Sequence, residues 1–471
     1  PAGPAMLPPP PNAKHELHVD VVSEDETELN EDEILVVRLL FPQDVSRVTL
    51  RKIGKGWTSA AKFFCEPTVA EGGAEVTGAP TFLKMGKVEK LEHELNVTQY
   101  MMEVLGGFCP QFLGYAEHGG LAAIHLSLAD LGDRSPRGLA ELYEELMREK
   151  AGTPKGDRLL ARVSTAIDFV FDDLLRRLHS AISHEISAFS IADELGFCKD
   201  LAGGKTGVEK GLNMKSAFLL EKLWRNAPGD GSLASSVRTH IRQILGEEAA
   251  ESGALRFLRG HPLELPNICT ALLDSHETLA ELRTASHGRH RTCFVHGDLH
   301  GDNIMVDARD NRFLIDFGKT GIGFGLEDAT YLESFVMLSY TELPSDAELA
   351  EALDLVPMLA PPEGLTVDCC ESLWPEGTAP PASPRVAAMR AVVGRIRSHL
   401  GHGMRRLARV SPEGPEKYLQ QAGLAAALLL LRNSLFFLAA RENQAQPARR
   451  RLALALACAY ARSVVRMLPG K

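Results

Sequence analysis

The stretch FVHGDLHGDNIMVDARDNRFLIDFG, residues 294–318, gives the strongest indication of fold in this sequence. Short apolar runs at 294–295 and 304–306 flank a polar turn, and a third run at 313–315 leads into Asp316. Short apolar runs interrupted by turn residues predict strand ends and a hairpin. Four polar side chains would then meet at one mouth of the hairpin: His296, Asp298, Asn303 and Asp316.

These residue types match what the transfer of a γ-phosphoryl group requires. One carboxylate orients the acceptor hydroxyl and takes its proton, while an amide oxygen and a second carboxylate hold Mg²⁺ against the phosphates. Hard oxygen ligands suit this hard cation. An HGD or a DFG alone is usually a turn beside a strand, whereas both together, in this order and spacing, favour a phosphotransfer site.

HGDLHGDN, residues 296–303, closely resembles the motif H-G-D-x-x-x-x-N of aminoglycoside phosphotransferases and choline/ethanolamine kinases. LIDFG, residues 314–318, resembles the metal-binding D-F-G of the protein-kinase-like superfamily. Protein kinases usually have Arg where Gly297 sits, so the small-molecule kinase branch fits better. The run from LIDFGKTGIG to LEDATYLE is most similar to the kinase-like domain of ternary complex associated type, which is attached to signalling NTPases.

The resemblance implies a role for each polar residue of the hairpin. Asp298 would be the catalytic base, and Asn303 and Asp316 would be the metal ligands. His296 would brace the loop rather than react. Asp328 would support the loop from the start of a helix, where Asp is a suitable cap.

The composition is that of an ordinary globular protein. The 471 residues are enough for two or three core-forming units, and 45% are apolar and 24% charged. The 51 basic and 62 acidic residues give a net charge of −11, which disfavours nucleic acid as a partner.

Two further features bear on the protein's environment. The eight cysteines form no paired C-x-x-C motifs, which argues against a zinc site and favours buried thiols in the cytoplasm or another reducing compartment. The most apolar segment, 424–431, is interrupted by Arg432 and Asn433. A bilayer core is about 30 Å thick, so we expect a buried helix here and no membrane span.

The order of segments predicts a bilobal, protein-kinase-like α+β fold with a small strand-rich N-lobe and a large helical C-lobe. Residues 1–34, which are Pro-rich and then acidic, are expected to be a disordered tail. The N-lobe would occupy 35–128. The C-lobe would occupy 129–471, with the catalytic hairpin at 294–318 and surface insertions.

Within the N-lobe, apolar runs at 34–40, 48–53 and 61–65 are strand-like, and the segment 66–80 is expected to be a variable loop. A further strand is expected at 81–85. Apolar residues at helical spacing then predict a helix over 88–105, and two strands would lead from it to the hinge between the lobes.

A glycine loop lies between two of these strands. Gly54 and Gly56 would let backbone N–H groups approach phosphate closely, and Ser59 stands where G-x-G-x-x-G has its third glycine. A lone G-x-G is usually only a turn. The position of this loop between two strands favours a nucleotide-covering loop. Aminoglycoside kinases often have a polar residue in place of the third glycine, as Ser59 is here.

Lys84 resembles the lysine that pairs the α- and β-phosphates of ATP. The helix after it offers Glu92 and Glu94 as partners, and Glu94 better fits the family's helix pattern. The alternative interpretation of either glutamate is that it is an ordinary solvent-exposed residue of the helix and does not pair with Lys84.

Residues 129–293 are expected to be mainly helical, with periodic segments at 139–148, 159–184, 215–224 and 233–245. The run LAGGKTG at 201–207 ends like a Walker A motif, but it lacks the first glycine and a preceding strand. It therefore predicts a glycine-rich surface loop.

A helix is expected at 328–340, then a long Pro- and Gly-containing loop. Three final helices would follow, at 385–407, 415–440 and 446–468.

Two functions are compatible with these residues. The first is an ATP- and Mg²⁺-dependent phosphotransferase that acts on a hydroxyl group, of a small molecule in preference to a protein. The second is a catalytically weak or inactive nucleotide-binding scaffold with a protein assembly partner. Fold analogy cannot separate the two. The complete set of site residues favours catalysis.

Overall fold

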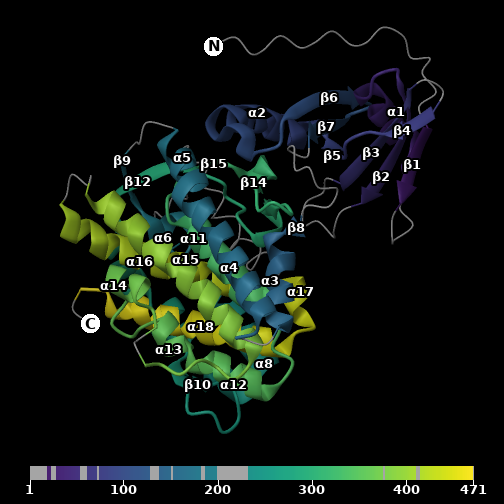
Figure 1. The fold of residues 1–471 in the computed structure, drawn as a ribbon. Coiled ribbons are helices and arrows are strands. Elements are labelled where there is room, and N and C mark those ends of the chain that lie inside the picture. The colour runs from purple at the N-terminus through teal and green to yellow at the C-terminus, as the bar shows by residue number, and fades with distance from the viewer. Residues whose placement is uncertain are drawn as a thin grey trace. The chain divides into compact units, whose positions relative to one another are not determined.

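The computed structural model describes residues 18–22, 28–52, 61–71, 74–127, 137–149, 152–181, 186–198, 232–374, 377–409 and 414–469 (Figure 1). The chain divides into two compact units. The first, here the sheet unit, comprises Pro1–Pro136 and Asp307–Gly318. The second, the helical unit, comprises Arg137–Val306 and Lys319–Lys471.

The sheet unit is built around seven strands in the order β1-β2-β3-β5-β7-β6, with β4 paired to β3. β1 and β2 are parallel, and the other pairs are antiparallel. The strands are β1 His18–Val22, β2 Val45–Lys52, β3 Ala61–Glu71, β4 Ala74–Thr77, β5 Thr81–Lys87, β6 Phe112–His118 and β7 Leu121–Ser127. The short strand β14, Arg312–Leu314, also belongs to this unit.

Three expectations for this unit need correction. The run at 34–40 is not a strand but part of helix α1, Glu31–Leu40, which begins with a capping box formed by Asn30 and Glu33. The tail expected over residues 1–34 contains β1 and the start of α1. The loop expected over 66–80 contains the end of β3 and all of β4.

Helix α2, Val88–Leu105, has the bounds that the sequence predicts. It starts directly after β5, and a 3₁₀ turn, η1 Gly106–Phe108, follows it. Leu91 of α2 packs with Phe82 of β5 and Ile124 of β7. The other side of the sheet buries Val36 and Val37 of α1 with residues of β2 and β3.

The helical unit contains most of the helices. Its longer helices are α3 Leu139–Arg148, α4 Pro154–Phe169, α8 Leu233–Leu245, α10 His276–Ala285, α11 Glu327–Phe335, α12 Asp346–Asp354, α15 Pro384–Ala408, α16 Pro415–Ala439 and α18 Pro447–Arg466. Its shorter helices are α5 Leu175–Ser180, α6 Ile191–Glu194, α9 Glu247–Glu251, α13 Val356–Leu359, α14 Val367–Glu371 and α17 Arg441–Gln444. π-helical turns are η2 Val170–Leu174, η4 Cys269–Leu273 and η7 Val336–Tyr340.

Short strands flank residues 296–303 in this unit. β12, His287–Val295, pairs with β9, Ile186–Ser190, and with β15, Gly321–Phe324. β13, Ile304–Val306, pairs with β8, Arg137–Gly138. A separate hairpin joins β10, Ala254–Arg256, to β11, Glu264–Pro266.

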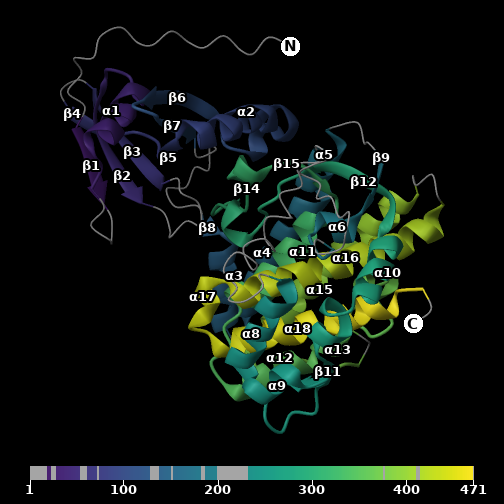
Figure 2. The same ribbon diagram turned by 180° about the vertical axis from the view of Figure 1, so that it is seen from behind.

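The core of the helical unit is formed by the long C-terminal helices. Figures 1 and 2 show α16 and α18 packed side by side, with α15 against α16. α16 is long and apolar enough to cross a membrane, but 94% of its most apolar window is buried within the protein. Its 424–431 segment is therefore a core element, as the sequence predicts.

The α+β class is confirmed, and so are the predicted helices at 139–148 and 233–245. The helix expected at 328–340 corresponds to α11 and η7. The loop expected after it is partly helical, because α12, α13 and α14 lie there. The helix expected at 215–224 lies outside the described residues.

Candidate phosphotransfer site

The sheet unit buries a lysine between two carboxylates. Lys84 of β5 is 3% exposed, and its Nζ lies 2.5 Å from Oε2 of Glu94 on α2 and 2.7 Å from Oδ1 of Asp316. Glu94 is buried too, whereas Glu92 faces solvent. The structure thus brings together Lys84, Glu94 and Asp316, and it places the predicted glutamate at the lysine.

A second lysine in this cluster was not predicted from the sequence. Lys62 of β3 lies directly opposite Lys84 in the β3–β5 register, and its Nζ contacts Oδ2 of Asp316. Two like charges at directly opposed positions of a sheet repel each other. The carboxylate of Asp316 compensates both, and phosphate oxygens could do the same.

The charges of this cluster follow from burial and proximity. Burial alone would raise the pKa of Asp316. The ammonium groups of Lys84 and Lys62 have a larger, opposite effect and hold the pKa of Asp316 far below its ordinary value. Burial would lower the pKa of Lys84, but Asp316 and Glu94 outweigh it and raise this pKa. The pKa of Glu94 is raised by burial, which Lys84 only partly offsets. Asp316 is therefore a carboxylate and Lys84 an ammonium.

Backbone geometry at the end of the motif fits this arrangement. Asp316 has φ of 64°, a conformation that costs a non-glycine residue energy and is often found at functional sites. A Cβ on Gly318 would lie 3.0 Å from Glu94 Oε2 and 3.5 Å from Lys84 Nζ. Glycine at this position therefore leaves room for the Lys84–Glu94 pair.

In the helical unit, the loop after β12 is held by Asp328 in the first turn of α11. The backbone N–H groups of His296 and Gly297 donate to the two carboxylate oxygens of Asp328, each at 2.9 Å. Thr320 Oγ1 donates to the carbonyl of His296 at 3.0 Å. Asp328 thus supports the loop, although the N-cap of α11 is Leu326.

Asp328 is fully buried, and burial raises its pKa to about 7 against the lowering effect of the two backbone hydrogen bonds. The nearby charges of Glu327 and Asp298 add to the increase. The carboxyl that anchors the loop therefore titrates near neutral pH.

Gly297 is required by close backbone packing. It has φ of 73°, and a Cβ built on it would lie 2.4 Å from the backbone carbonyl oxygen of Lys319. Any larger residue would push the loop away from the segment that follows DFG. This contact accounts for glycine where protein kinases usually have Arg.

Asp298 is 6% exposed and has two side-chain neighbours that the motif did not predict. Lys319 Nζ lies 2.7 Å from Asp298 Oδ1 and is itself partly exposed. Tyr331 of α11 is buried, and both burial and its hydrogen bond and charge contact with Asp298 raise its pKa well above the ordinary value. The position of Lys319 directly after the DFG motif could have indicated its contact with Asp298. Nothing in the sequence around Tyr331 indicated that this residue contacts Asp298.

Asn303 lies in a 3₁₀ turn, η5 Gly301–Asn303, where its Nδ2 donates to the carbonyl of Asp298 at 2.9 Å. This leaves the amide oxygen as its acceptor end. Among the described residues no group of three or more His, Cys, Asp or Glu side chains could hold a metal ion. Carboxylate and amide oxygens, which Asp316 offers in the sheet unit and Asn303 in the helical unit, are each a type of donor that suits Mg²⁺.

The glycine loop lies outside the described residues, so Gly54, Gly56 and Ser59 stay predictions. The Walker-like run at 201–207 also lies outside them.

Comparison with known families agrees with the resemblance seen in the sequence. Residues 218–430 match the family model described as Ternary complex associated domain 9. The matched segment spans less than half of the chain. No curated protein matches the chain.

Solved phosphotransferase structures are similar to this chain. An aminoglycoside-3'-phosphotransferase of type VIII is 15% identical, with 78% of this chain and 100% of that chain covered and a TM-score of 0.33. A thermostable mutant of aminoglycoside phosphotransferase APH(4)-Ia, in ternary complex with ADP and hygromycin B, is 12% identical, with 94% and 99% covered and a TM-score of 0.35. An ethanolamine kinase of Plasmodium vivax is 12% identical, with 90% and 82% covered and a TM-score of 0.31.

Proposed function

We propose that the protein is an ATP-dependent phosphotransferase that moves the γ-phosphoryl group to a hydroxyl acceptor, a small molecule in preference to a protein. The observation that carries the proposal is the buried contact of Lys84 with Glu94 and Asp316. A buried ammonium group is costly unless it is paired. A lysine held in this way is prepared to contact the α- and β-phosphates of a nucleotide.

The other residues would complete the reaction. Asp298 would orient the acceptor hydroxyl and accept its proton, since its loop is fixed by Asp328. Asn303 and Asp316 would hold Mg²⁺, which when bound supplies neutralisation of phosphate charge. Catalysis would then consist mainly of positioning and electrostatic stabilisation.

Further residues would position the nucleotide and the base. Gly54, Gly56 and Ser59 would cover the phosphates with backbone N–H groups. Lys319 would hold the carboxylate of Asp298 through its hydrogen bond.

One observation favours a second function, a nucleotide-binding scaffold in a protein assembly. Both oxygens of Asp316 are engaged by lysines, so a metal ion would have to displace at least one of these contacts. The match to a ternary complex associated domain also fits a protein with assembly partners. A scaffold would keep the nucleotide as a structural ligand and transfer no phosphate.

Nucleotide turnover across a panel of hydroxylated acceptors distinguishes the two functions. The assay measures ADP formation with Mg²⁺-ATP, for the wild-type protein and for Asp298→Ala. Acceptor-dependent ADP formation that requires Asp298 supports the phosphotransferase. Stable nucleotide binding without turnover, unchanged by Asp298→Ala, supports the scaffold.

A further inference from the structure

The side chain of Asn303 has a fixed orientation. Its Nδ2 lies 2.9 Å from the backbone carbonyl oxygen of Asp298. A carbonyl oxygen can only accept a hydrogen bond, so the amide nitrogen and not the amide oxygen must face it. The second contact of the same nitrogen is Nε2 of His300, at 3.2 Å.

This second contact determines the tautomer of His300. Because Nδ2 of Asn303 offers only N–H groups, Nε2 of His300 must accept, and the ring hydrogen of the neutral imidazole is then on Nδ1. Nδ1 lies 3.4 Å from the hydroxyl oxygen of Tyr340 and 3.3 Å from Oδ2 of Asp302. Both of these atoms can accept the Nδ1–H.

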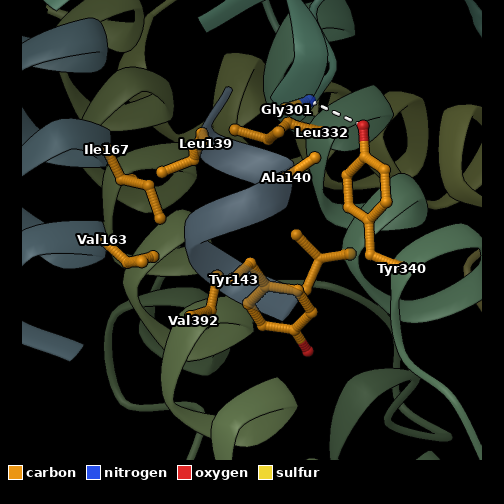
Figure 3. Close-up of a pocket in the computed structure, with 10 residues that line it drawn as sticks. Leu139, Ala140, Tyr143, Val163, Ile167, Gly301, Leu332, Tyr340 and Val392 are labelled. Atoms are coloured by element: carbon orange, nitrogen blue, oxygen red, sulfur yellow. Dashed lines mark hydrogen bonds between the residues drawn. The ribbon is translucent and has the colours of Figure 1, made fainter. Parts of the chain in front are cut away.

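Tyr340 supports His300 from the end of η7. Its hydroxyl accepts from the backbone N–H of Gly301 at 2.9 Å, the contact drawn in Figure 3, and donates to Oδ2 of Asp302 at 3.1 Å. A phenolic hydroxyl has one hydrogen and can accept two hydrogen bonds. The backbone N–H groups of Gly301 and Asp302 both face this hydroxyl, and the carboxylate of Asp302 accepts its hydrogen. The Nδ1–H of His300 therefore has Oδ2 of Asp302 as an acceptor beside the hydroxyl oxygen of Tyr340.

Packing holds the same geometry. The ring of His300 is stacked on Phe335, with centroids 4.8 Å apart and planes 22° from parallel. A Cβ on Gly301 would lie 2.8 Å from the backbone nitrogen of Ala140, so the turn is pressed against α3. Tyr340 and Ala140 also line a small apolar cavity of about 10 Å³ (Figure 3). The imidazole therefore has little freedom to turn.

We propose that His300, held as its Nδ1–H tautomer by Tyr340 and Asp302, is a positioning residue that keeps the amide nitrogen of Asn303 on the Asp298 carbonyl and so leaves the amide oxygen for Mg²⁺. This inference rests on the proposed function, in which Asn303 is a metal ligand. The opposite tautomer would place an N–H of His300 against the N–H groups of Asn303. The amide would then tend to rotate and present nitrogen in place of oxygen.

The test measures metal affinity directly, by electron paramagnetic resonance titration of Mn²⁺ into the full chain with the non-hydrolysable analogue AMP-PNP. His300→Ala should weaken Mn²⁺ binding by about 10- to 100-fold, the usual effect of losing a group that orients a metal ligand. His300→Gln, whose amide oxygen can accept from Asn303, should recover part of the affinity. Tyr340→Phe should weaken binding in the same direction and by less.

Two controls separate this inference from a general loss of structure. Affinity for AMP-PNP without metal should be unchanged in His300→Ala. The double variant His300→Ala/Asn303→Ala should bind Mn²⁺ no more weakly than Asn303→Ala alone, because His300 acts through Asn303.

Wild-type Mn²⁺ affinity in His300→Ala, with affinity lost in Asn303→Ala, would overturn the positioning role and leave the proposed function intact. Unchanged affinity in Asn303→Ala would contradict the metal site itself, and the inference would fall with it. Should the variants not fold, ¹⁵N-histidine spectra of the wild-type protein decide the tautomer. An Nδ1–H signature supports the proposal, and an Nε2–H signature overturns it.

Discussion

Asp298 and Asp316 each have a lysine partner that lies outside the recognised motif. Lys319 contacts Asp298, and Lys62 contacts Asp316. An ammonium–carboxylate hydrogen bond is shorter and stronger than a neutral one, so both contacts help to fix the position of these two carboxylates. At the residue scale, these contacts give the proposed chemistry its first tests.

Lys319→Ala should lower kcat of the proposed transfer by about 10- to 100-fold, because a hydrogen bond to a charged group contributes about 1.5–3 kcal/mol. Lys319→Arg keeps the charge and should restore part of the rate. Lys417→Ala, at an exposed position of α16, is the matched control and should leave the rate unchanged. Steady-state kinetics of ADP formation measure all three, and a wild-type rate in Lys319→Ala would contradict the role of Lys319.

Asp328 gives a prediction for pH. The pKa of its buried carboxyl is about 7 in the folded protein and about 4 in an unfolded chain. Between these values the folded state holds a proton that the unfolded state has lost, so the free energy of unfolding contributed by this group should fall as pH rises. Denaturant unfolding at intervals between pH 4 and pH 8 measures this dependence. The free energy of unfolding should decrease less with rising pH in Asp328→Asn than in the wild-type protein. Identical pH profiles for the two proteins would refute the raised pKa.

At the scale of elements, the loop after β12 depends on one glycine. Gly297→Ala should lower the free energy of unfolding by about 1–3 kcal/mol, because φ is positive and the added Cβ meets the Lys319 carbonyl. Gly253→Ala is the matched control, since no atom lies within 4 Å of its Cβ and its φ is ordinary. Chemical denaturation measures both, and equal stabilities for the two variants would show that the loop tolerates a side chain at 297.

The sequence predicted elements well where a local signal was strong. Helical periodicity predicted α2, the family's helix pattern indicated Glu94, and the apolar runs at 304–306 and 313–315 predicted strands that correspond to β13 and β14. The run at 34–40 misled because β-branched and apolar residues are common in strands. The deciding signal was nearby, since Asn30 and Glu33 form a capping box that starts a helix.

Other contacts could not be predicted from the sequence, because they depend on strand register and tertiary packing. Lys62 faces Lys84 only through the β3–β5 register. Tyr340 reaches Gly301 and His300 from a helix end that lies far along the chain. No spacing or composition in the sequence indicates either contact.

At the scale of the whole molecule, the sequence predicted the α+β class and the final helices, which correspond to α15, α16 and α18. The family match covers 218–430, which lies in the helical unit apart from the segment 307–318. The lysine cluster around Asp316 lies in the sheet unit.

The central claim is that Asp298 acts as a base in phosphoryl transfer, and the most direct test compares binding with turnover in Asp298→Asn. Calorimetry should give wild-type affinity for Mg²⁺-ATP, because Asp298 is not a metal ligand in this account. ADP formation with the best acceptor should fall by about 10²–10⁴-fold, the usual effect of losing a general base. Retained binding with lost transfer is the predicted result, and equal turnover by Asp298→Asn and the wild-type protein would contradict the account.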